Sequence, residues 1–297
     1  MADHTHTPVL FNEVINALDP KPGSVIVDCT LNGGGHATAL AGRGARVIGI
    51  EWDPVIAGEF STRHPELGDT VTVVNDSYTN LEDICRTHHV VPDGILFDLG
   101  PSSLHYEASG RGFSFMRPDE PLDMRFNPET VAVTAGELVN SESVEELERI
   151  LREYGEEQFA GQIAAAIVIA RRAAPLRTVG DLVTVISDAV PNWYRHRKLH
   201  PATKTFQALR IAVNGELDNV RRGVTAAIHT LKPGGVLAVI SFHGLEDRLV
   251  RELFKEATRA GRVEWVTRAT IRPTWDEIKH NPRARSAKLK LVRKLIS

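Results

Sequence analysis

SVIVDCTLNGGGH, residues 24–36, is the stretch that decides the fold of this chain. Its first part, Ser24 to Asp28, is a short apolar run typical of a buried parallel strand. Three consecutive glycines follow, which let the backbone turn sharply and approach a ligand before a helix begins near His36. A buried strand, a glycine bend and a helix in this order indicate an α/β fold of the Rossmann type.

Further apolar runs extend this pattern along the chain. They lie at 46–51, 71–75, 94–98 and 235–242, and an alternating polar and apolar run at 288–291 suits a half-exposed strand. The segments between the early runs are long enough for crossover helices, so we predict a doubly wound parallel sheet. The long gap before 235–242 contains no convincing strand. We therefore expect a discontinuous sheet domain, residues 1–105 and 202–297, with an inserted helical domain at 106–201.

The inserted segment begins as a loop and continues as helices. Residues 109–127 are rich in Gly, Arg and Phe. Ser143 has the position of a helix N-cap, and Thr178 is placed to cap a later helix. Helices are expected to end at Pro175 and before Pro191. We expect this domain to recognise the substrate, on the side where open α/β sheets bind ligands.

The composition excludes several protein classes. With 42% hydrophobic and 25% charged residues the chain has the mix of a soluble globular enzyme, and its longest apolar run, 163–170, is too short to span a bilayer. The first ten residues lack the pattern of a secretory signal, so we expect a cytoplasmic protein without a membrane partner. Cys29 and Cys85 form no CxxC pair, which argues against zinc sites and disulfides. No histidine pair has a carboxylate at metal-ligand spacing, so no catalytic metal is expected.

Charge is unevenly distributed, although the net charge is only −3. Residues 137–160 contain eight acids and two arginines, whereas residues 251–297 contain thirteen Lys and Arg and five acids. A basic region of this kind permits contact with nucleic-acid phosphates, and a solvated face accounts for it equally well. The basic and aromatic run 193–198, at the end of the inserted segment, is a further candidate for RNA contact.

The glycine bend and Glu51 together indicate a nucleoside cofactor. Glu51 ends the second strand run, 23 residues after Asp28, where a carboxylate suits a grip on ribose hydroxyls. The dinucleotide-binding motif GxGxxG is incomplete, because Thr38 stands at the position of its third glycine. The Lys-Ser or Lys-Thr pair that ends a phosphate-binding P-loop does not follow the glycines either. S-adenosylmethionine fits a glycine bend and a ribose acid without a dedicated phosphate site. A nicotinamide dinucleotide and a purely structural turn are the alternatives.

Asp98 is the candidate catalytic residue. It ends the fourth strand run, whose carboxyl end opens onto the ligand crevice of such sheets. An exocyclic base amine is a poor nucleophile because its lone pair is delocalised into the ring. A carboxylate that accepts a hydrogen bond from the amine helps to orient and activate it.

Nine sequence blocks follow in order over nearly the whole chain. They are HTPVL (6–10), GGH (34–36), DLGPSS (98–103), RGFSFMR (111–117), PLDMR (121–125), YGEE (154–157), HPATKTFQALRI (200–211), SFHGLEDR (241–248) and NPRARSAK (281–288). In these blocks the chain resembles the RsmH (MraW) methyltransferases.

The resemblance implies a class I, S-adenosylmethionine-dependent methyltransferase fold with an inserted helical domain. It implies methylation of the N4 amine of a cytidine in the decoding region of 16S ribosomal RNA, within the small ribosomal subunit or a late precursor. By position, the cofactor contacts would be Gly34, Gly35, His36, Glu51, Tyr78, Asp98 and His105. Departures from the usual family residues are Tyr78 for Phe, His105 for Gln, Asn32 for Gly and Gly244 for Ser.

Several residues are candidates for substrate contact. Phe113, Phe115 and Phe242 are candidates to stack an extruded base, with core packing as the alternative for each. Arg111 is on the same polar loop as Phe113 and Phe115, which favours substrate contact there. Lys204 and Arg210 are candidates to face phosphates, with a solvated helix position as the alternative, and His243 follows the fifth strand run beside the expected crevice.

Three other functions compete with the RNA cytosine methyltransferase. They are a DNA amino-methyltransferase, an RNA-binding assembly factor without turnover, and a nicotinamide oxidoreductase. Comparing RNA with DNA as methyl acceptor, and testing for cofactor binding, would separate them. The sequence leaves the oligomeric state open.

Overall fold

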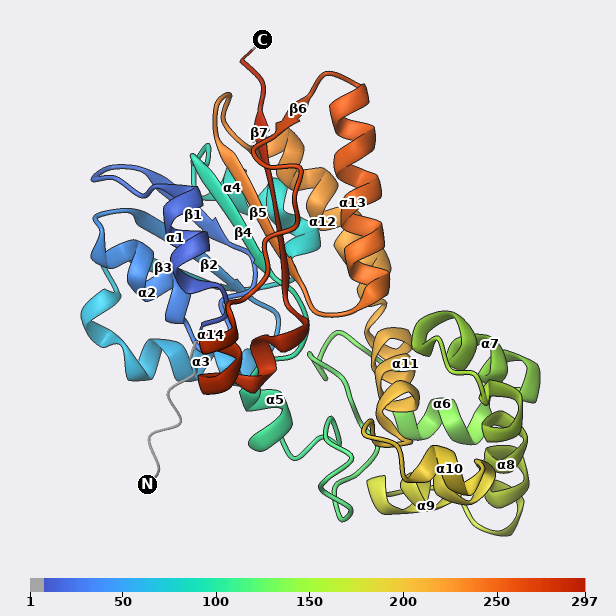
Figure 1. Ribbon diagram of the computed structural model, residues 1–297. Helices are drawn as coiled ribbons and strands as arrows, with labels where there is room; N and C mark the ends of the chain where they lie inside the picture. The colour runs from blue at the N-terminus through green and yellow to red at the C-terminus, as the bar shows by residue number, and fades with distance from the viewer. Residues whose placement is uncertain (1–7, 297) are drawn as a thin grey trace. The chain divides into compact units, whose positions relative to one another are not determined.

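The computed structural model describes residues 8–296, which form two compact units (Figure 1). The sheet unit comprises the chain up to Ser102 and from Leu217 onward, and the helical unit comprises Ser103–Glu216. Of the sequence block at residues 6–10, His6 and Thr7 lie outside the described residues.

The sheet unit is built on seven strands. They are β1 (Val25–Asp28), β2 (Arg46–Glu51), β3 (Val71–Asn75), β4 (Gly94–Asp98), β5 (Val236–Ser241), β6 (Val263–Trp265) and β7 (Lys288–Lys294), in the order β3-β2-β1-β4-β5-β7-β6. Strands β1 to β5 pair in parallel, and β7 runs antiparallel to both β5 and β6. This sheet confirms the α/β, class I methyltransferase fold. The three-residue β6 was not foreseen.

Helices cover both faces of the sheet (Figure 1). One face buries apolar side chains of α1 (Phe11–Leu18), α2 (Gly35–Gly42) and α3 (Pro54–Arg63). The other face buries side chains of α4 (Leu81–Thr87), α12 (Glu216–Thr230) and α13 (Gly244–Arg259). Two cores flank the sheet, as parallel strands that are buried on both faces require. The remaining short elements are η1 (Pro65–Leu67), η2 (Tyr78–Asn80), α14 (Trp275–His280) and η3 (Pro282–Ser286).

The helical unit has a core of its own, to which its longer helices contribute. Its helices are α5 (Ser103–Glu107), α6 (Ala135–Ser141), α7 (Val144–Gly155), α8 (Ala160–Ala173), α9 (Val179–Ala189), α10 (Asn192–Arg195) and α11 (Thr203–Asn214). The expected boundary at residue 201 is wrong for this unit. Phe206 and Leu209 of α11 are buried in its core, so the unit extends to Glu216.

The predicted helix signals in this unit are confirmed. Ser143 accepts a hydrogen bond from the backbone N–H of Glu146 (3.1 Å) at the start of α7, and Thr178 accepts one from Asp181 (3.2 Å) at the start of α9. Helix α8 ends before Pro175, and α9 ends before Pro191. Residues 109–127 form no helix or strand, only an isolated bridge between Pro121 and Thr178. Within residues 8–296, no helix combines the length and apolar character needed to cross a membrane.

Candidate active site

Three acids end adjacent parallel strands of the sheet unit. Asp28 ends β1, Glu51 ends β2 and Asp98 ends β4. In the register of the sheet, Asp28 lies opposite Gly49 of β2 and Leu96 of β4, so the three strands end at one edge. The carboxyl edge of a doubly wound sheet is where ligands bind. All three side chains are buried.

The loop after β1 ties these strand ends together. Thr30 accepts a hydrogen bond at its hydroxyl from the backbone N–H of Asp98 (2.6 Å), and the N–H of Leu31 donates to the carbonyl of Ile50 (2.9 Å). The N–H of Asn32 donates to Glu51 Oε2 (2.8 Å). Hydrogen bonds from backbone N–H groups therefore tie the loop after β1 to the ends of β2 and β4.

The glycine bend has no room for side chains. Asn32 (φ 50°) and Gly34 (φ 77°) adopt left-handed backbone, and an asparagine tolerates this conformation better than most residues. A Cβ on Gly34 would lie 2.0 Å from Phe60, and one on Gly35 would lie 2.3 Å from Pro8. These close contacts explain why glycine stands at both positions at the start of α2.

Glu51 is held by two backbone donors. Its Oε2 accepts from the N–H of Asn32 (2.8 Å) and its Oε1 from the N–H of Asp53 (2.9 Å). Each carboxylate oxygen keeps acceptor capacity for a ligand hydroxyl. Burial raises the pKa of Glu51 to about 7, and the charges of Asp53 and Asp28 act in the same direction. Burial likewise raises the pKa of Asp28 to about 7.

Asp98 has the most strongly perturbed carboxyl of the three. Burial raises its pKa to about 8, and the charges of Asp28 and Glu246 add to the effect. Its Oδ1 is buried and has no hydrogen-bond partner among the described residues. Its Oδ2 lies 3.8 Å from Nδ1 of His36, which is longer than a hydrogen bond.

His36 is oriented by the chain segment before α1. Because a carbonyl only accepts, the ring donates from Nε2 to the carbonyl of Val9 (3.1 Å). This hydrogen bond fixes the ring with Nδ1 towards Oδ2 of Asp98.

These features fit S-adenosylmethionine. Three buried acids with raised pKa values favour a ligand that brings positive charge, because an opposite charge nearby stabilises the ionised carboxylates. Glu51 at the end of β2 suits ribose hydroxyls, and the bare bend allows close approach of the ligand. Asp98 Oδ1 remains available as an acceptor.

The other predicted residues of the sheet unit lie near this edge. Tyr78 packs edge-on against Phe97 (5.3 Å between ring centroids) and against Gly223, where a Cβ would lie 2.5 Å from its ring. Phe242 follows β5 and is half-buried. His243 caps α13, accepting a hydrogen bond from the N–H of Glu246 (3.4 Å), which gives it a structural task besides any substrate contact.

Two predicted substrate contacts in the helical unit are wrong. Phe113 is 4% exposed and stacks on Phe126 (5.4 Å, 22°), so it is a core residue rather than a platform for a base. Arg210 is 8% exposed, and its Nε donates to Glu216 (2.7 Å). A buried, paired guanidinium does not meet phosphates from solution.

Other candidates in this unit also have structural contacts. Arg111 donates from one nitrogen to the carbonyls of Arg125 and Phe126 (2.9 Å each), and Lys204 donates to the carbonyl of Glu156 (2.6 Å). Phe115 stacks on His200 (4.4 Å, 5°). His105 is buried and packs edge-on against Phe113 and Phe126.

Sequence reasoning missed the importance of Asp28 and Thr30. Asp28 was treated only as the end of a strand, yet it is a buried acid whose charge raises the pKa of Asp98. Thr30 positions the backbone of Asp98. The available signal was an aspartate at the carboxyl end of a central apolar run.

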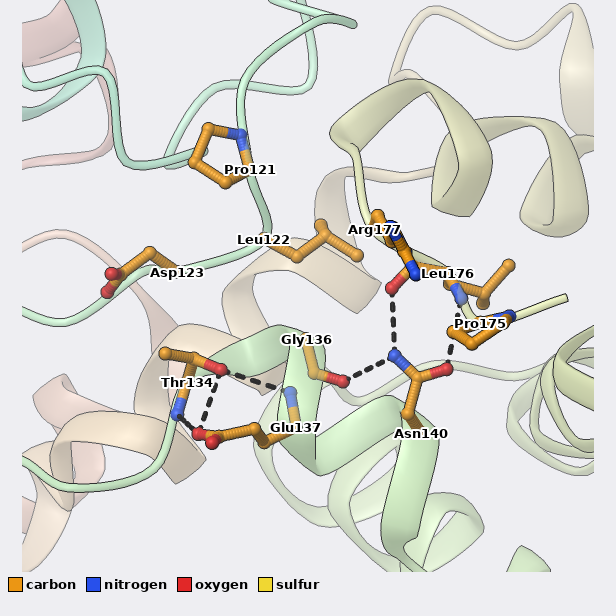
Figure 2. Close-up of a pocket in the computed structure, with 10 residues that line it drawn as sticks. All are labelled: Pro121, Leu122, Asp123, Thr134, Gly136, Glu137, Asn140, Pro175, Leu176 and Arg177. Atoms are coloured by element: carbon orange, nitrogen blue, oxygen red, sulfur yellow. Dashed lines mark hydrogen bonds between the residues drawn. The ribbon is translucent and has the colours of Figure 1, made fainter.

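A cavity of about 350 Å³ lies in the helical unit (Figure 2). Its polar lining groups bind one another. Asn140 donates to the carbonyls of Gly136 and Leu176 and accepts from the N–H of Leu176, and Thr134 and Glu137 form a capping box. These groups hold a loop against α6, so we regard the cavity as a structural feature.

Comparison with known proteins agrees with this geometry. The model of the MraW methylase family matches residues 3–295. Proteins named ribosomal RNA small subunit methyltransferase H are similar over nearly their whole length. The one from Symbiobacterium thermophilum is 43% identical, covering 99% of this chain and 98% of that protein. The one from Heliobacterium modesticaldum is 42% identical, covering 98% of each. The chain belongs to the MraW methylase family.

Proposed function

We propose that this protein transfers a methyl group from S-adenosylmethionine to the N4 amine of a cytidine in the decoding region of 16S ribosomal RNA. The single observation that carries the chemistry is Asp98, a buried acid at the end of β4 whose Oδ1 has no hydrogen-bond partner among the described residues. The choice of RNA rests on relatives that are named small-subunit ribosomal RNA methyltransferases.

The cofactor site in this proposal is the carboxyl edge of the sheet. The backbone of Gly34 and Gly35 lies along the nucleoside, Glu51 accepts hydrogen bonds from the ribose hydroxyls, and the ring of Tyr78 packs on adenine. His36 lies beside Asp98, and His105 completes the set that the family resemblance implies. When bound, the cofactor supplies an electrophilic methyl group and a positive charge.

Asp98 has two tasks in this proposal. Its carboxyl group loses its proton when a cation enters the pocket, because an opposite charge offsets the effect of burial on its pKa. Its Oδ1 then accepts a hydrogen bond from the cytosine amine and holds the nitrogen in line for attack. The nitrogen–carbon bond would form as the sulfur–methyl bond of the sulfonium breaks, neutral S-adenosylhomocysteine would leave, and the methylated amine would lose one proton to solvent.

The substrate in this proposal is the RNA within a small ribosomal subunit or a late precursor, in the cytoplasm. A base in folded RNA has to leave its stack before it can enter a buried pocket. Phe242 and His243 follow β5 at the same edge of the sheet and are the proposed contacts for that base.

A methylation assay tests the proposal. Small subunits from cells that lack this gene are incubated with the protein and S-adenosylmethionine, and nuclease digests of the RNA are analysed by mass spectrometry. N4-methylcytidine is expected. Asp98→Asn should reduce its rate of formation by about 100-fold or more. Asp83→Asn, at an exposed position of α4, is the matched control and should retain activity. Methylation of naked DNA but not of RNA would refute the choice of substrate.

A further inference from the structure

Trp193 is an exposed aromatic side chain held in a fixed position. It lies on α10 and is 63% exposed. The ring of Phe159 packs edge-on against the indole, with 5.8 Å between ring centroids and 61° between ring planes. The ring of Tyr194 packs against it in the same way, at 5.6 Å and 84°. Tyr194 is itself fully buried and donates its hydroxyl proton to Glu157 (2.6 Å). The indole is therefore anchored through the core of the helical unit while most of its surface faces solvent.

Basic side chains follow this indole directly. Arg195, His196 and Lys198 are exposed, and the guanidinium of Arg197 lies 3.4 Å from the ring centroid of Tyr194. Arg195 forms an exposed ion pair with Asp188 at 3.9 Å, which contributes little in water, and its Nε donates to the carbonyl of Val190 (3.3 Å). The segment 192–200 contains no acid. A rigid exposed aromatic ring beside several cations is the combination with which proteins bind single-stranded nucleic acid.

We infer that Trp193 stacks an unpaired base of the substrate RNA, while Arg195 and Lys198 contact neighbouring phosphates. The inference rests on the proposed function, and it assigns part of RNA recognition to the helical unit. Charge favours RNA over a second copy of the chain, since two such segments facing each other would bring like charges together. The acids of α7, such as Glu145, disfavour RNA contact on that helix.

Binding measurements test the stacking contact. Affinity for labelled oligocytidylate and for a 16S RNA transcript is measured by fluorescence anisotropy. Trp193→Ala should weaken binding by about 5- to 100-fold, and Trp193→Phe should restore most of it. RNA should also quench tryptophan emission of the wild type more than that of Trp193→Phe, because only a stacked indole is quenched directly. Val133→Ala, at an exposed apolar position of the same unit, is the control.

Salt dependence separates stacking from phosphate contact. Arg195→Gln and Lys198→Gln should each lower the slope of log affinity against log salt by about one. Trp193→Ala should leave that slope unchanged. Arg152→Gln, which removes an exposed cation of α7 paired with Glu148, should change neither slope nor affinity.

Three outcomes would overturn the inference. They are unchanged RNA affinity in Trp193→Ala, an equal loss in Val133→Ala, and a change in oligomeric state on sedimentation without a change in RNA affinity. Failure of the proposed function would look different. The wild type would then make no N4-methylcytidine, while quenching by RNA could still be measured. If both proposals hold, Trp193→Ala should raise KM for RNA with little change in kcat and unchanged cofactor affinity.

Discussion

Lowering the pH should weaken binding of S-adenosylmethionine by a large and calculable factor. Burial raises the pKa of Asp98 to about 8, so in the free protein this carboxyl is mostly protonated below pH 8. A cationic ligand favours the ionised form, and binding therefore expels a proton. If the pKa of Asp98 in the complex falls below 6, the affinity at pH 6 should be about 50-fold lower than at pH 8.

Isothermal titration calorimetry at pH 6, 7 and 8 measures this effect. Repeating the titrations in buffers of different ionisation enthalpy counts the protons released. S-adenosylhomocysteine is the matched ligand control, because it keeps the ribose and amino acid but lacks the sulfonium charge, and its affinity should vary less. Asp98→Asn should weaken the dependence for S-adenosylmethionine, and the part that remains reflects Glu51 and Asp28, whose pKa values burial raises to about 7. An affinity that changes by less than about threefold over this range, or equally in the Asn variant, would refute the assigned electrostatics.

Three further predictions concern the framework of the site. Asp98→Asn should raise the Tm of the free protein at pH 8 but not at pH 4, because burial raises the pKa of Asp98 in the folded state to about 8 and ionisation of this group in the unfolded chain opposes folding between these pH values. An equal Tm of the two proteins at pH 8 would contradict this. Gly34→Ala should abolish cofactor binding and cost about 1–3 kcal/mol of unfolding free energy, since its Cβ would lie 2.0 Å from Phe60; normal binding in calorimetry would be inconsistent with the close packing. Arg210→Ala should lower the free energy of unfolding, measured with denaturant, by about 3–5 kcal/mol, because it leaves Glu216 buried without its partner. A loss of RNA affinity without a loss of stability would instead support Arg210 as an RNA contact.

The central strands could be predicted from sequence because each carries its own signal. Strands β1 to β5 are apolar runs bounded by turn residues, and their predicted ends agree with the structure to within a residue. Strand β6 has only three residues, too few for any periodicity, and it exists because it pairs with β7. The boundary of the helical unit was misplaced for a similar reason. The assignment of α11 depends on where its buried face packs, and the periodicity of a helix does not reveal its neighbours.

The residues of the candidate site also differ in whether the sequence carries a signal for them. Glu51 and Asp98 could be identified because the end of a parallel strand is a known position relative to the ligand crevice. Phe113 and Arg210 were misjudged because an aromatic ring in a loop and a cation on a helix have no sequence mark of burial. Their partners, Phe126 and Glu216, are themselves unremarkable in the sequence. Raised pKa values likewise depend on burial that only the packed structure reveals.

The discontinuity of the sheet unit has a consequence for how the chain is made. Strand β4 pairs with β5, yet the whole helical unit is translated between them. At ordinary rates of synthesis the delay between β4 and β5 is roughly 7–27 s. During that time β4, with Ile95 and Phe97 fully buried in the finished protein, has an open edge on the nascent chain. A newly made chain is therefore most prone to aggregation before its last third leaves the ribosome, and chaperone contact should be concentrated in that interval.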